Sequence, residues 1–186
     1  MVRLSLYLLH LLAPFAALSA AVTPRTSPPA GCISVARSGG QKFTTIQAAV
    51  NSLSTTSTSA QCIFIYPGTY PEQVYISARS AKLTIYGSTS DPSSYVQNSV
   101  TITAGVSQDN TPSNDLTGTL RAWAVGLKVY NVNIVNSRGQ GSQAIALSAQ
   151  ADQQGYYGVK LVGYQDTLLA NTGKQVYAKS YIDGAT

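Results

Sequence analysis

Leu161-Val162-Gly163 repeats a short pattern of this chain, in which two apolar residues are followed by a residue that turns easily. The pattern also occurs at Ile134-Val135-Asn136 and at Tyr181-Ile182-Asp183-Gly184, at intervals of about 20 to 27 residues. These intervals are too long for hairpins and are typical of coils that stack on one another. Gly and Asn allow a sharp turn at each corner. We therefore predict an all-β fold, a right-handed parallel β-helix, and keep a β-sandwich as the alternative.

Further strands and one helix are predicted from periodicity and turn residues. The strand segments are rich in β-branched residues and Tyr, and Gly, Pro, Asn or Ser separates them. They cover residues 63–66, 74–76, 83–86, 100–103, 127–135, 144–147, 158–162 and 175–182. A helix is expected over Thr44–Leu53, where apolar residues fall at helical spacing and Thr44 with Gln47 predicts a capping box. We expect this helix to cap the N-terminal end of the β-helix.

The first 31 residues precede the predicted β-helix domain, which covers residues 32–186. Residues 1–20 have a positive start, an apolar stretch and small residues at their end, which together indicate a signal peptide. The apolar stretch is too short for a confident membrane span. We therefore predict a secreted, extracellular protein that does not bind membranes. Residues 21–31, rich in Pro, Ser and Thr, are expected to form a flexible leader.

Cys32 and Cys62 are the two cysteines of the chain. In an oxidising compartment a disulfide between them would close a loop of about 30 residues and stabilise the fold by about 3 kcal/mol. Two buried free thiols are the alternative, and the sequence alone does not decide between them.

Composition excludes several kinds of function. The net charge of +5 is spread along the chain without a basic cluster, which argues against nucleic acid binding and suits an acidic polysaccharide. The one histidine, His10, lies in the predicted signal peptide. A mature protein without histidine has neither a Ser-His-Asp triad nor a His-ligated metal site. We predict that it uses no metal and no organic cofactor.

Gln143, Gln165 and Asp166 are the candidate catalytic residues. Gln143 opens a predicted strand, and Gln165-Asp166 follows the next one about one coil later. Equivalent positions of successive coils stack about 4.8 Å apart, so the three side chains should meet on one outward face. Amides can stabilise a developing oxyanion, and a carboxyl can protonate a leaving alcohol. The alternative is that these are solvated turn residues, with Asp166 capping a local turn.

Four segments of the chain carry family motifs: Phe43–Val50, Gly68-Thr69-Tyr70-Pro71-Glu72, Gln143–Leu147 and Tyr164–Leu168. In this order they resemble the pectin methylesterase (pectinesterase) family, in its fungal form. The resemblance implies hydrolysis of the methyl esters of polygalacturonan, with methylated pectin as substrate and methanol as product. It also implies that Asp166 is the general acid and base and that Gln143 and Gln165 hold the oxyanion.

The same resemblance places a second aspartate, the nucleophile, directly after Thr186. Later coils of the family are expected beyond this point as well. We therefore interpret the 186-residue chain as an N-terminal part of such an enzyme, without esterase activity of its own. Its last coil would leave an unpaired sheet edge that favours aggregation, although the enzyme itself is expected to be a monomer.

Two other classes of protein remain as alternatives. One is a pectate-lyase-like β-helix enzyme, which would need a cluster of acidic calcium ligands. The other is a non-catalytic homologue that binds the plant cell wall.

Several other residues are given structural roles. Glu72 is expected to satisfy backbone groups beside Pro71, Asp183 to sit at a turn, and Trp123 to pack in the core or between coils rather than form a sugar platform. Four further aspartates are expected to lie in polar loops without a role: Asp91, Asp109, Asp115 and Asp152.

Overall fold

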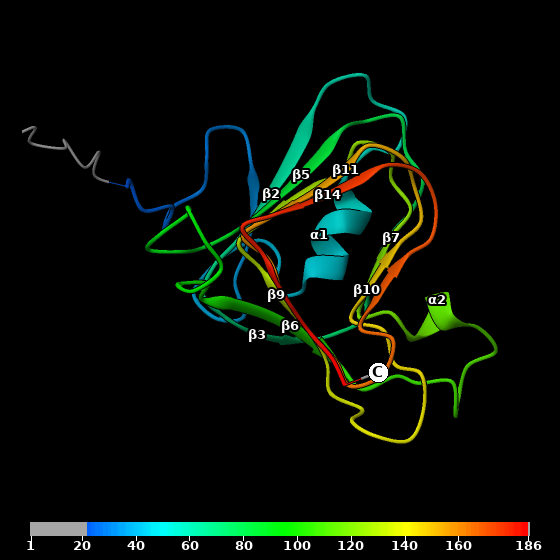
Figure 1. Cartoon of the computed structure of the whole chain (residues 1–186). Coiled ribbons are helices and arrows are strands. Elements are labelled where there is room, and N and C mark those ends of the chain that lie inside the picture. The colour runs from blue at the N-terminus through cyan, green and yellow to red at the C-terminus, as the bar shows by residue number, and fades with distance from the viewer. Residues whose placement is uncertain (1–21, 186) are drawn as a thin grey trace, which may run out of the picture.

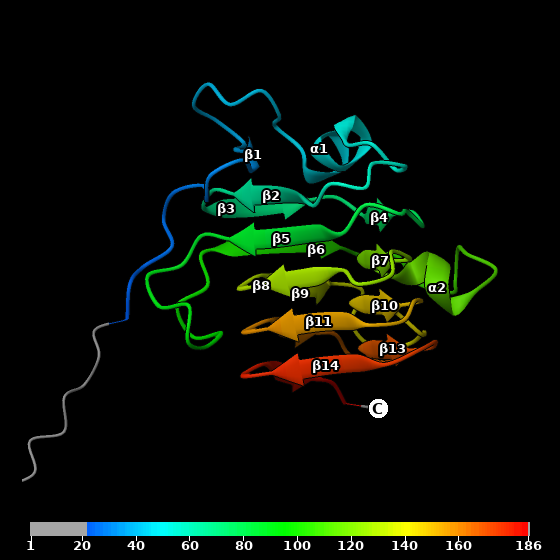
Figure 2. The same cartoon turned by 90° about the horizontal axis from the view of Figure 1, so that it is seen from above.

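The chain winds into a right-handed parallel β-helix, seen along its axis in Figure 1 and from the side in Figure 2. The computed structural model describes residues 22–185, so the predicted signal peptide lies outside the described residues. Within this range the strands form three sheets of six, four and five strands. All pairings between these strands are parallel. The predicted β-helix is therefore confirmed, and the β-sandwich alternative is wrong.

Each sheet takes one strand from successive coils. The first sheet consists of β1 (Ile33–Val35), β2 (Gln61–Ile65), β5 (Leu83–Gly87), β8 (Lys128–Tyr130), β11 (Gln154–Tyr157) and β14 (Gln175–Ala178). The second consists of β4 (Val74–Ile76), β7 (Leu120–Ala122), β10 (Leu147–Ala149) and β13 (Leu168–Ala170). The third consists of β3 (Gly68–Pro71), β6 (Val100–Ala104), β9 (Asn133–Asn136), β12 (Lys160–Val162) and β15 (Tyr181–Asp183).

Side chains at paired positions of successive strands form columns that fill the interior. On the first sheet one column runs through Ile63, Ile85, Val129, Tyr156 and Tyr177. The Tyr156 ring is fully buried and stacks on Tyr177, with 5.1 Å between the ring centroids. Burial raises the pKa of the Tyr156 hydroxyl well above its ordinary value. The column stabilises the stack because each apolar side chain is covered from above and below.

Two predicted strands are each divided by a corner. The segment 127–135 separates into β8 and β9 at Asn131, and the segment 175–182 separates into β14 and β15 at Lys179. Both residues have a left-handed backbone, with φ of 54° and 53°, and Gly158 has φ of 59° at the same corner of the coil between them. β-branched residues, Tyr and other strand formers lie on both sides of Asn131 and Lys179, so the prediction joined the two strands of each segment into one.

A second corner agrees with the prediction from the repeated pattern. Register places Asn136, Gly163 and Gly184 one above another. The Asn136 side-chain amide donates to the carbonyl oxygens of Val106, Thr117 and Ile145 at 2.9, 3.1 and 3.0 Å. One buried amide thus satisfies backbone groups of three neighbouring segments, which explains why Asn suits this corner.

The predicted helix closes the N-terminal end of the stack, as expected (Figure 2). It is shorter than predicted: α1 covers Ile46–Ser52, and its N-cap is Thr45, whose Oγ1 accepts from the Ala48 N–H at 3.3 Å. The capping box predicted from Thr44 and Gln47 is therefore wrong, because it is shifted by one residue. A second helix, α2 (Asn114–Thr117), projects beside β7 (Figure 1). No helix among residues 22–185 is long and apolar enough to cross a membrane.

Part of the expected flexible leader is held against the first sheet. Arg25 and Thr89 exchange backbone hydrogen bonds of 2.9 and 3.0 Å. The Arg25 guanidinium lies over the rings of Tyr86 and Tyr130, 4.9 and 5.7 Å from their centroids. The expectation of a flexible leader therefore needs correcting at Arg25, because these contacts fix it to the β-helix.

Cys32 and Cys62 form a disulfide, which resolves the choice that the sequence left open. The bond joins the residue before β1 to the adjacent strand β2.

Replacing both cysteines by Ala is expected to lower the free energy of unfolding by about 3 kcal/mol, since the unfolded chain then gains the entropy of an open loop. Urea denaturation monitored by circular dichroism measures this change. Reduction of the parent protein should give a similar loss, and an unchanged midpoint for the double variant would contradict the expectation.

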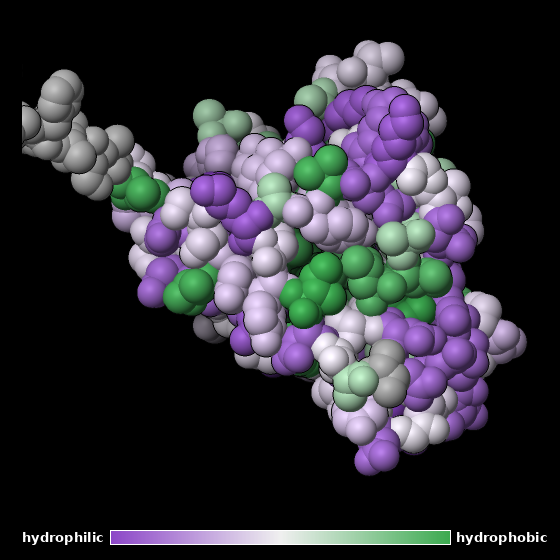
Figure 3. Space-filling view, in the orientation of Figure 1, coloured by the Kyte–Doolittle hydropathy of each residue, from purple (hydrophilic) through white to green (hydrophobic). Residues whose placement is uncertain are grey.

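The last described coil lies at the opposite end of the stack, and none of the described residues covers it. There β13, β14 and β15 each pair on one side only. Figure 3 shows hydrophobic side chains gathered in the middle of this end. Val176 and Ile182 in this coil are 54% and 47% exposed. The predicted aggregation of the chain through this end stays a prediction.

Candidate active site

The three candidate catalytic residues lie on adjacent coils of one edge of the second sheet. Gln143 stands four residues before β10, and Gln165 and Asp166 lie in the turn between β12 and β13. The N–H of Ala144 donates to the carbonyl oxygen of Gln165 at 3.1 Å. This bond joins the two segments, so the predicted neighbourhood of Gln143 with Gln165-Asp166 is present in the backbone. The predicted strand at 144–147 is misplaced, since β10 begins only at Leu147.

Their side chains are available for a ligand. All three are partly exposed, and no hydrogen bond among residues 22–185 engages the side-chain amides of Gln143 and Gln165 or the carboxyl of Asp166. By contrast, the residues that follow Gln143 are buried: Ala144, Ile145 and Ala146. The Ile145 N–H donates to Thr117 Oγ1 at 3.0 Å. These buried, hydrogen-bonded residues thus support the exposed polar side chains of the candidate site.

The turn that carries Asp166 is packed closely. The hydroxyl of Thr167 donates to the carbonyl oxygen of Asp183 at 2.9 Å. A Cβ at Gly163 or Gly184 would lie 2.8 or 2.6 Å from Thr167 Oγ1. Glycine at both positions is therefore needed for Thr167 to lie between the neighbouring coils.

Asp166 itself has a left-handed backbone, with φ of 59°. This conformation is uncommon outside glycine and costs on the order of 1–3 kcal/mol when it is strained. The hydrogen bonds of Thr167 and of Ala144 on either side of Asp166 hold it in place. Asn131, Gln153 and Lys179 adopt the same backbone conformation, and Asp is among the residues that tolerate it, so this φ fits a turn and does not by itself indicate a catalytic role.

An ion pair that the sequence did not reveal joins the loops beside Gln143. The Gln108 N–H donates to the Gln143 carbonyl oxygen at 3.0 Å. The neighbouring Asp109 accepts from Arg138 Nη2 at 2.6 Å and from Ser107 Oγ at 3.0 Å. The hydrogen bonds from Arg138 and Ser107 lower the pKa of the Asp109 carboxyl. Asp109, for which the sequence indicated only a place in a polar loop, therefore ties the loop after β6 to the loop that leads to Gln143.

Comparison with known proteins decides the family. The family model described as Pectinesterase matches residues 32–186. The chain belongs to the pectinesterase family. It is 56% identical to a pectinesterase of Aspergillus aculeatus over 171 residues, 91% of this chain and 51% of that protein. It is 52% identical to a pectinesterase of Aspergillus niger over 170 residues, with shares of 91% and 51%.

A solved fungal structure agrees with the fold. The pectin methylesterase from Aspergillus niger in deglycosylated form superposes with a TM-score of 0.82 at 42% identity, covering 87% of this chain and 52% of that chain. The predicted similarity to fungal pectinesterases is confirmed. This pectinesterase chain spans about half the length of the curated relatives that it matches.

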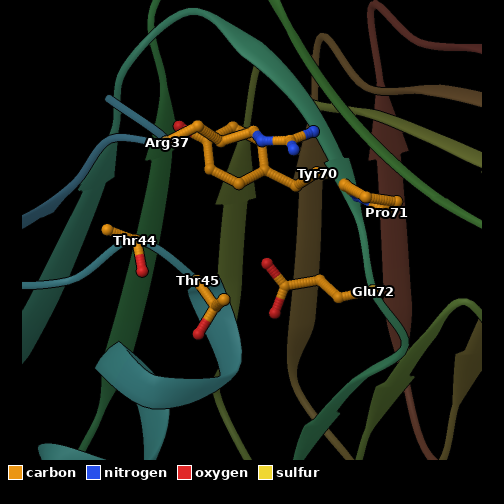
Figure 4. A pocket seen from close by; sticks show the side chains of 6 residues that line it. All are labelled: Arg37, Thr44, Thr45, Tyr70, Pro71 and Glu72. Carbon is orange, nitrogen blue, oxygen red and sulfur yellow. The ribbon is translucent and has the colours of Figure 1, made fainter. Parts of the chain in front are cut away.

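One family motif of this pectinesterase chain, Gly68-Thr69-Tyr70-Pro71-Glu72, has a structural role. The Glu72 carboxylate accepts from the N–H groups of Ile46 and Gln47 at 2.8 and 2.9 Å. These two N–H groups lie at the start of α1, where the helix itself offers them no acceptor. The Tyr70 hydroxyl donates to the Tyr66 carbonyl oxygen at 2.9 Å. Figure 4 shows the Glu72 carboxylate facing Thr45, in a pocket of about 230 Å³ that Arg37 also lines. The prediction that Glu72 satisfies backbone groups is confirmed.

The other carboxylates of this pectinesterase chain do not form a cluster. Asp183 is exposed at the end of β15. Asp152 accepts from the Lys174 N–H at 2.7 Å and stabilises the turn that precedes β14. Within residues 22–185, no group of three or more Cys, Asp or Glu side chains is placed to bind a metal ion.

Trp123 does not lie in the core, so that part of the prediction for this residue is wrong. It follows β7 on the outer face of the second sheet and is 38% exposed. Its Nε1–H donates to Asp115 Oδ1 at 3.2 Å. Asp115, which was expected to lack a role, therefore fixes the indole.

Proposed function

We propose that the full-length protein containing this segment is a secreted pectin methylesterase. It hydrolyses methyl esters of polygalacturonan to carboxylate and methanol, as a monomer and without metal or organic cofactor. The observation that carries the proposal is the hydrogen bond between Ala144 and Gln165, which brings Gln143 beside Gln165 and Asp166. Membership of the pectinesterase family supports the chemistry assigned to these three residues.

In the proposed reaction the two amides act on the ester carbonyl. As the tetrahedral intermediate forms, negative charge develops on the carbonyl oxygen, and the N–H groups of Gln143 and Gln165 donate to it. Removing one such donor typically lowers kcat by about 10²–10³-fold. Both side chains are free of internal partners among the described residues, so they need break no bond in order to bind the oxyanion.

Asp166 acts as the general acid and then as the general base. It donates a proton to the methoxy oxygen as the C–O bond breaks and methanol leaves. It then takes a proton from the water that attacks the acyl intermediate, which releases the free acid. Its carboxyl is partly exposed and has no hydrogen-bond partner among the described residues, which supports this role.

The nucleophile is proposed to be an aspartate that follows Thr186 in the longer protein. The Ala185 N–H donates to the Tyr164 carbonyl oxygen at 2.8 Å, so the chain here runs beside the turn that carries Gln165 and Asp166. A carboxylate one or two residues later would lie on the coil next to Asp166. Such a carboxylate could attack the ester carbon while Asp166 faces the leaving group.

Methanol release tests this function. The full-length protein is expected to release methanol from highly methylated pectin, in the presence of a calcium chelator and without forming unsaturated sugars. Unsaturated product, or a requirement for calcium, would indicate the pectate-lyase-like alternative. The 186-residue chain is expected to release no methanol above a boiled control. If the 186-residue chain binds pectin and the full-length protein releases no methanol, the wall-binding alternative is indicated.

A further inference from the structure

Two exposed aromatic side chains lie on neighbouring coils at the outer face of the second sheet. Tyr75 in β4 is 39% exposed, and Trp123 directly after β7 is 38% exposed. Tyr75 is in register with Arg121, and the Trp123 N–H donates to the Ile76 carbonyl oxygen at 2.9 Å. The Gln150 N–H in turn donates to the Ala122 carbonyl oxygen at 2.9 Å. We call Tyr75, Arg121, Trp123 and Gln150 the aromatic surface, since they occupy successive coils of one face.

Asp115 fixes this surface from α2. Its Oδ2 accepts from Arg121 Nε and Nη2 at 3.1 and 2.6 Å, and its Oδ1 accepts from Trp123 Nε1 at 3.2 Å and Ser148 Oγ at 2.8 Å. Both Asp115 oxygens are thereby satisfied. The Arg121 guanidinium lies over the Tyr75 ring, 4.7 Å from its centroid. Both rings are therefore held in place before any ligand binds, which lowers the entropy cost of binding.

Amide groups continue the surface towards the last coil. Gln150 Nε2 donates to Ser148 Oγ at 2.8 Å, and Asn171 Nδ2 donates to Gln150 Oε1 at 2.7 Å. Each amide nitrogen has a second N–H, and Asn171 Oδ1 is a further acceptor. Asn171 is exposed. A ligand with hydroxyl and carbonyl groups could bind here while its apolar face covers the rings.

We propose that the aromatic surface binds methyl-esterified galacturonan, as a binding site beside the candidate active site. This inference rests on the proposed function. The ion pair of Arg121 with Asp115 leaves the surface without net charge, at side-chain exposures of 17% and 16%. An esterified galacturonate unit is neutral and can cover such a surface, whereas a free galacturonate carboxylate would lose solvation without gaining a cation.

The position of the surface agrees with this ligand. The aromatic surface and the candidate active site share the second sheet, because Gln143 precedes β10 and Asp166 precedes β13. Ser148, beside the aromatic surface, follows Gln143 by five residues, which is at most about 17 Å of chain. One polysaccharide chain of a few sugar units can span this length. The aromatic surface would then bring esterified regions of the polymer to the reacting groups.

The chain offers a direct probe, because Trp123 is its one tryptophan. A methyl-esterified galacturonate hexamer is titrated into the 186-residue protein while tryptophan emission is recorded. We expect a saturable change in emission, and binding at least about tenfold weaker for the fully de-esterified hexamer. Tyr75→Ala should weaken binding of the esterified hexamer about tenfold, because one ring is lost, and Tyr75→Phe should retain it. Higher salt should change the affinity little, since the ligand is neutral.

Tyr181→Ala is the matched control. Tyr181 is equally exposed, at 39%, but lies on β15 in the third sheet, so this variant should bind like the parent. The proposal is overturned by an unchanged emission, by equal losses in the Tyr75 and Tyr181 variants, or by tighter binding of the de-esterified hexamer. Emission that responds to a protein partner and not to either hexamer would also overturn it.

Failure of this proposal can be told apart from failure of the proposed function. If the full-length protein releases methanol but Trp123 does not respond to the hexamer, only the binding site is wrong. If Trp123 responds and no methanol is released, the surface binds the polymer and the catalytic assignment is wrong.

Discussion

Full-length protein with Asp166→Asn is expected to show a kcat on methylated pectin about 10²–10⁴-fold below that of the parent. Asn keeps the size of the side chain and can hydrogen-bond, but it can neither protonate the leaving methanol nor activate water. Because the change removes proton transfer and not binding, KM should change little. Methanol release in initial-rate assays measures both parameters.

Asp183→Asn supplies the matched control for Asp166→Asn. Asp183 lies on the next coil, its side chain is exposed, and its carbonyl oxygen, which Asn retains, is what Thr167 binds. The control variant should therefore keep nearly the full rate. A rate for Asp166→Asn within tenfold of the parent would remove Asp166 from the reaction. An equal loss in the Asp183 variant would indicate that the turn, and not the acid, is what the reaction needs.

Glu72→Ala is expected to lower the free energy of unfolding by about 3–5 kcal/mol. The substitution leaves the N–H groups of Ile46 and Gln47 without their acceptor, and a hydrogen bond to a charged group contributes about 1.5–3 kcal/mol. The negative charge of Glu72 also interacts favourably with the positive end of the helix dipole at the start of α1, and this interaction is lost as well. For a chain of this size the melting temperature should fall by about 10 °C. Thermal unfolding followed by circular dichroism measures this.

Two variants determine the origin of the loss. Glu72→Gln keeps one acceptor oxygen and should lie between Ala and the parent protein. Asp183→Ala removes the same charge from an exposed position and should cost no more than about 0.5 kcal/mol. If Glu72→Ala is as stable as Asp183→Ala, the carboxylate does not hold α1 on the end of the stack.

The prediction of the fold rested on short-range patterns, which explains where it failed. The corner at Asn136, Gly163 and Gly184 was predicted because residues that turn easily occur there at coil spacing. The corner at Asn131 and Lys179 was missed because the left-handed backbone of a non-glycine residue is imposed by the neighbouring coils. At the helix, the misplaced N-cap has a similar cause. Thr44 and Thr45 are equally good caps in sequence, and Glu72, 26 residues from Ile46, fixes where the helix begins.

The neighbourhood of Gln143 with Gln165 and Asp166 was predicted from coil spacing, whereas the contacts around these residues were not. Gln143, Gln165 and Asp166 could be named because amides and a carboxyl are the groups that this chemistry needs. The role of Asp115 was not predicted, since an aspartate in a polar loop is indistinguishable from a turn residue until Arg121, Trp123 and Ser148 are brought around it. Trp123 was assigned to the core because tryptophan is usually covered.

The sequence by itself determined that this protein is a stack of parallel coils, since β-forming segments and turn residues recur at coil length. It also determined which side chains are available for chemistry. The tertiary structure decided the contacts that fix them, such as those of Asp115 with Arg121 and Trp123. Stacking brings together residues that are about 20 residues apart in the chain, and its register depends on interior columns such as that of Tyr156 and Tyr177. Contacts at that separation depend on packing between coils, and no local pattern encodes them.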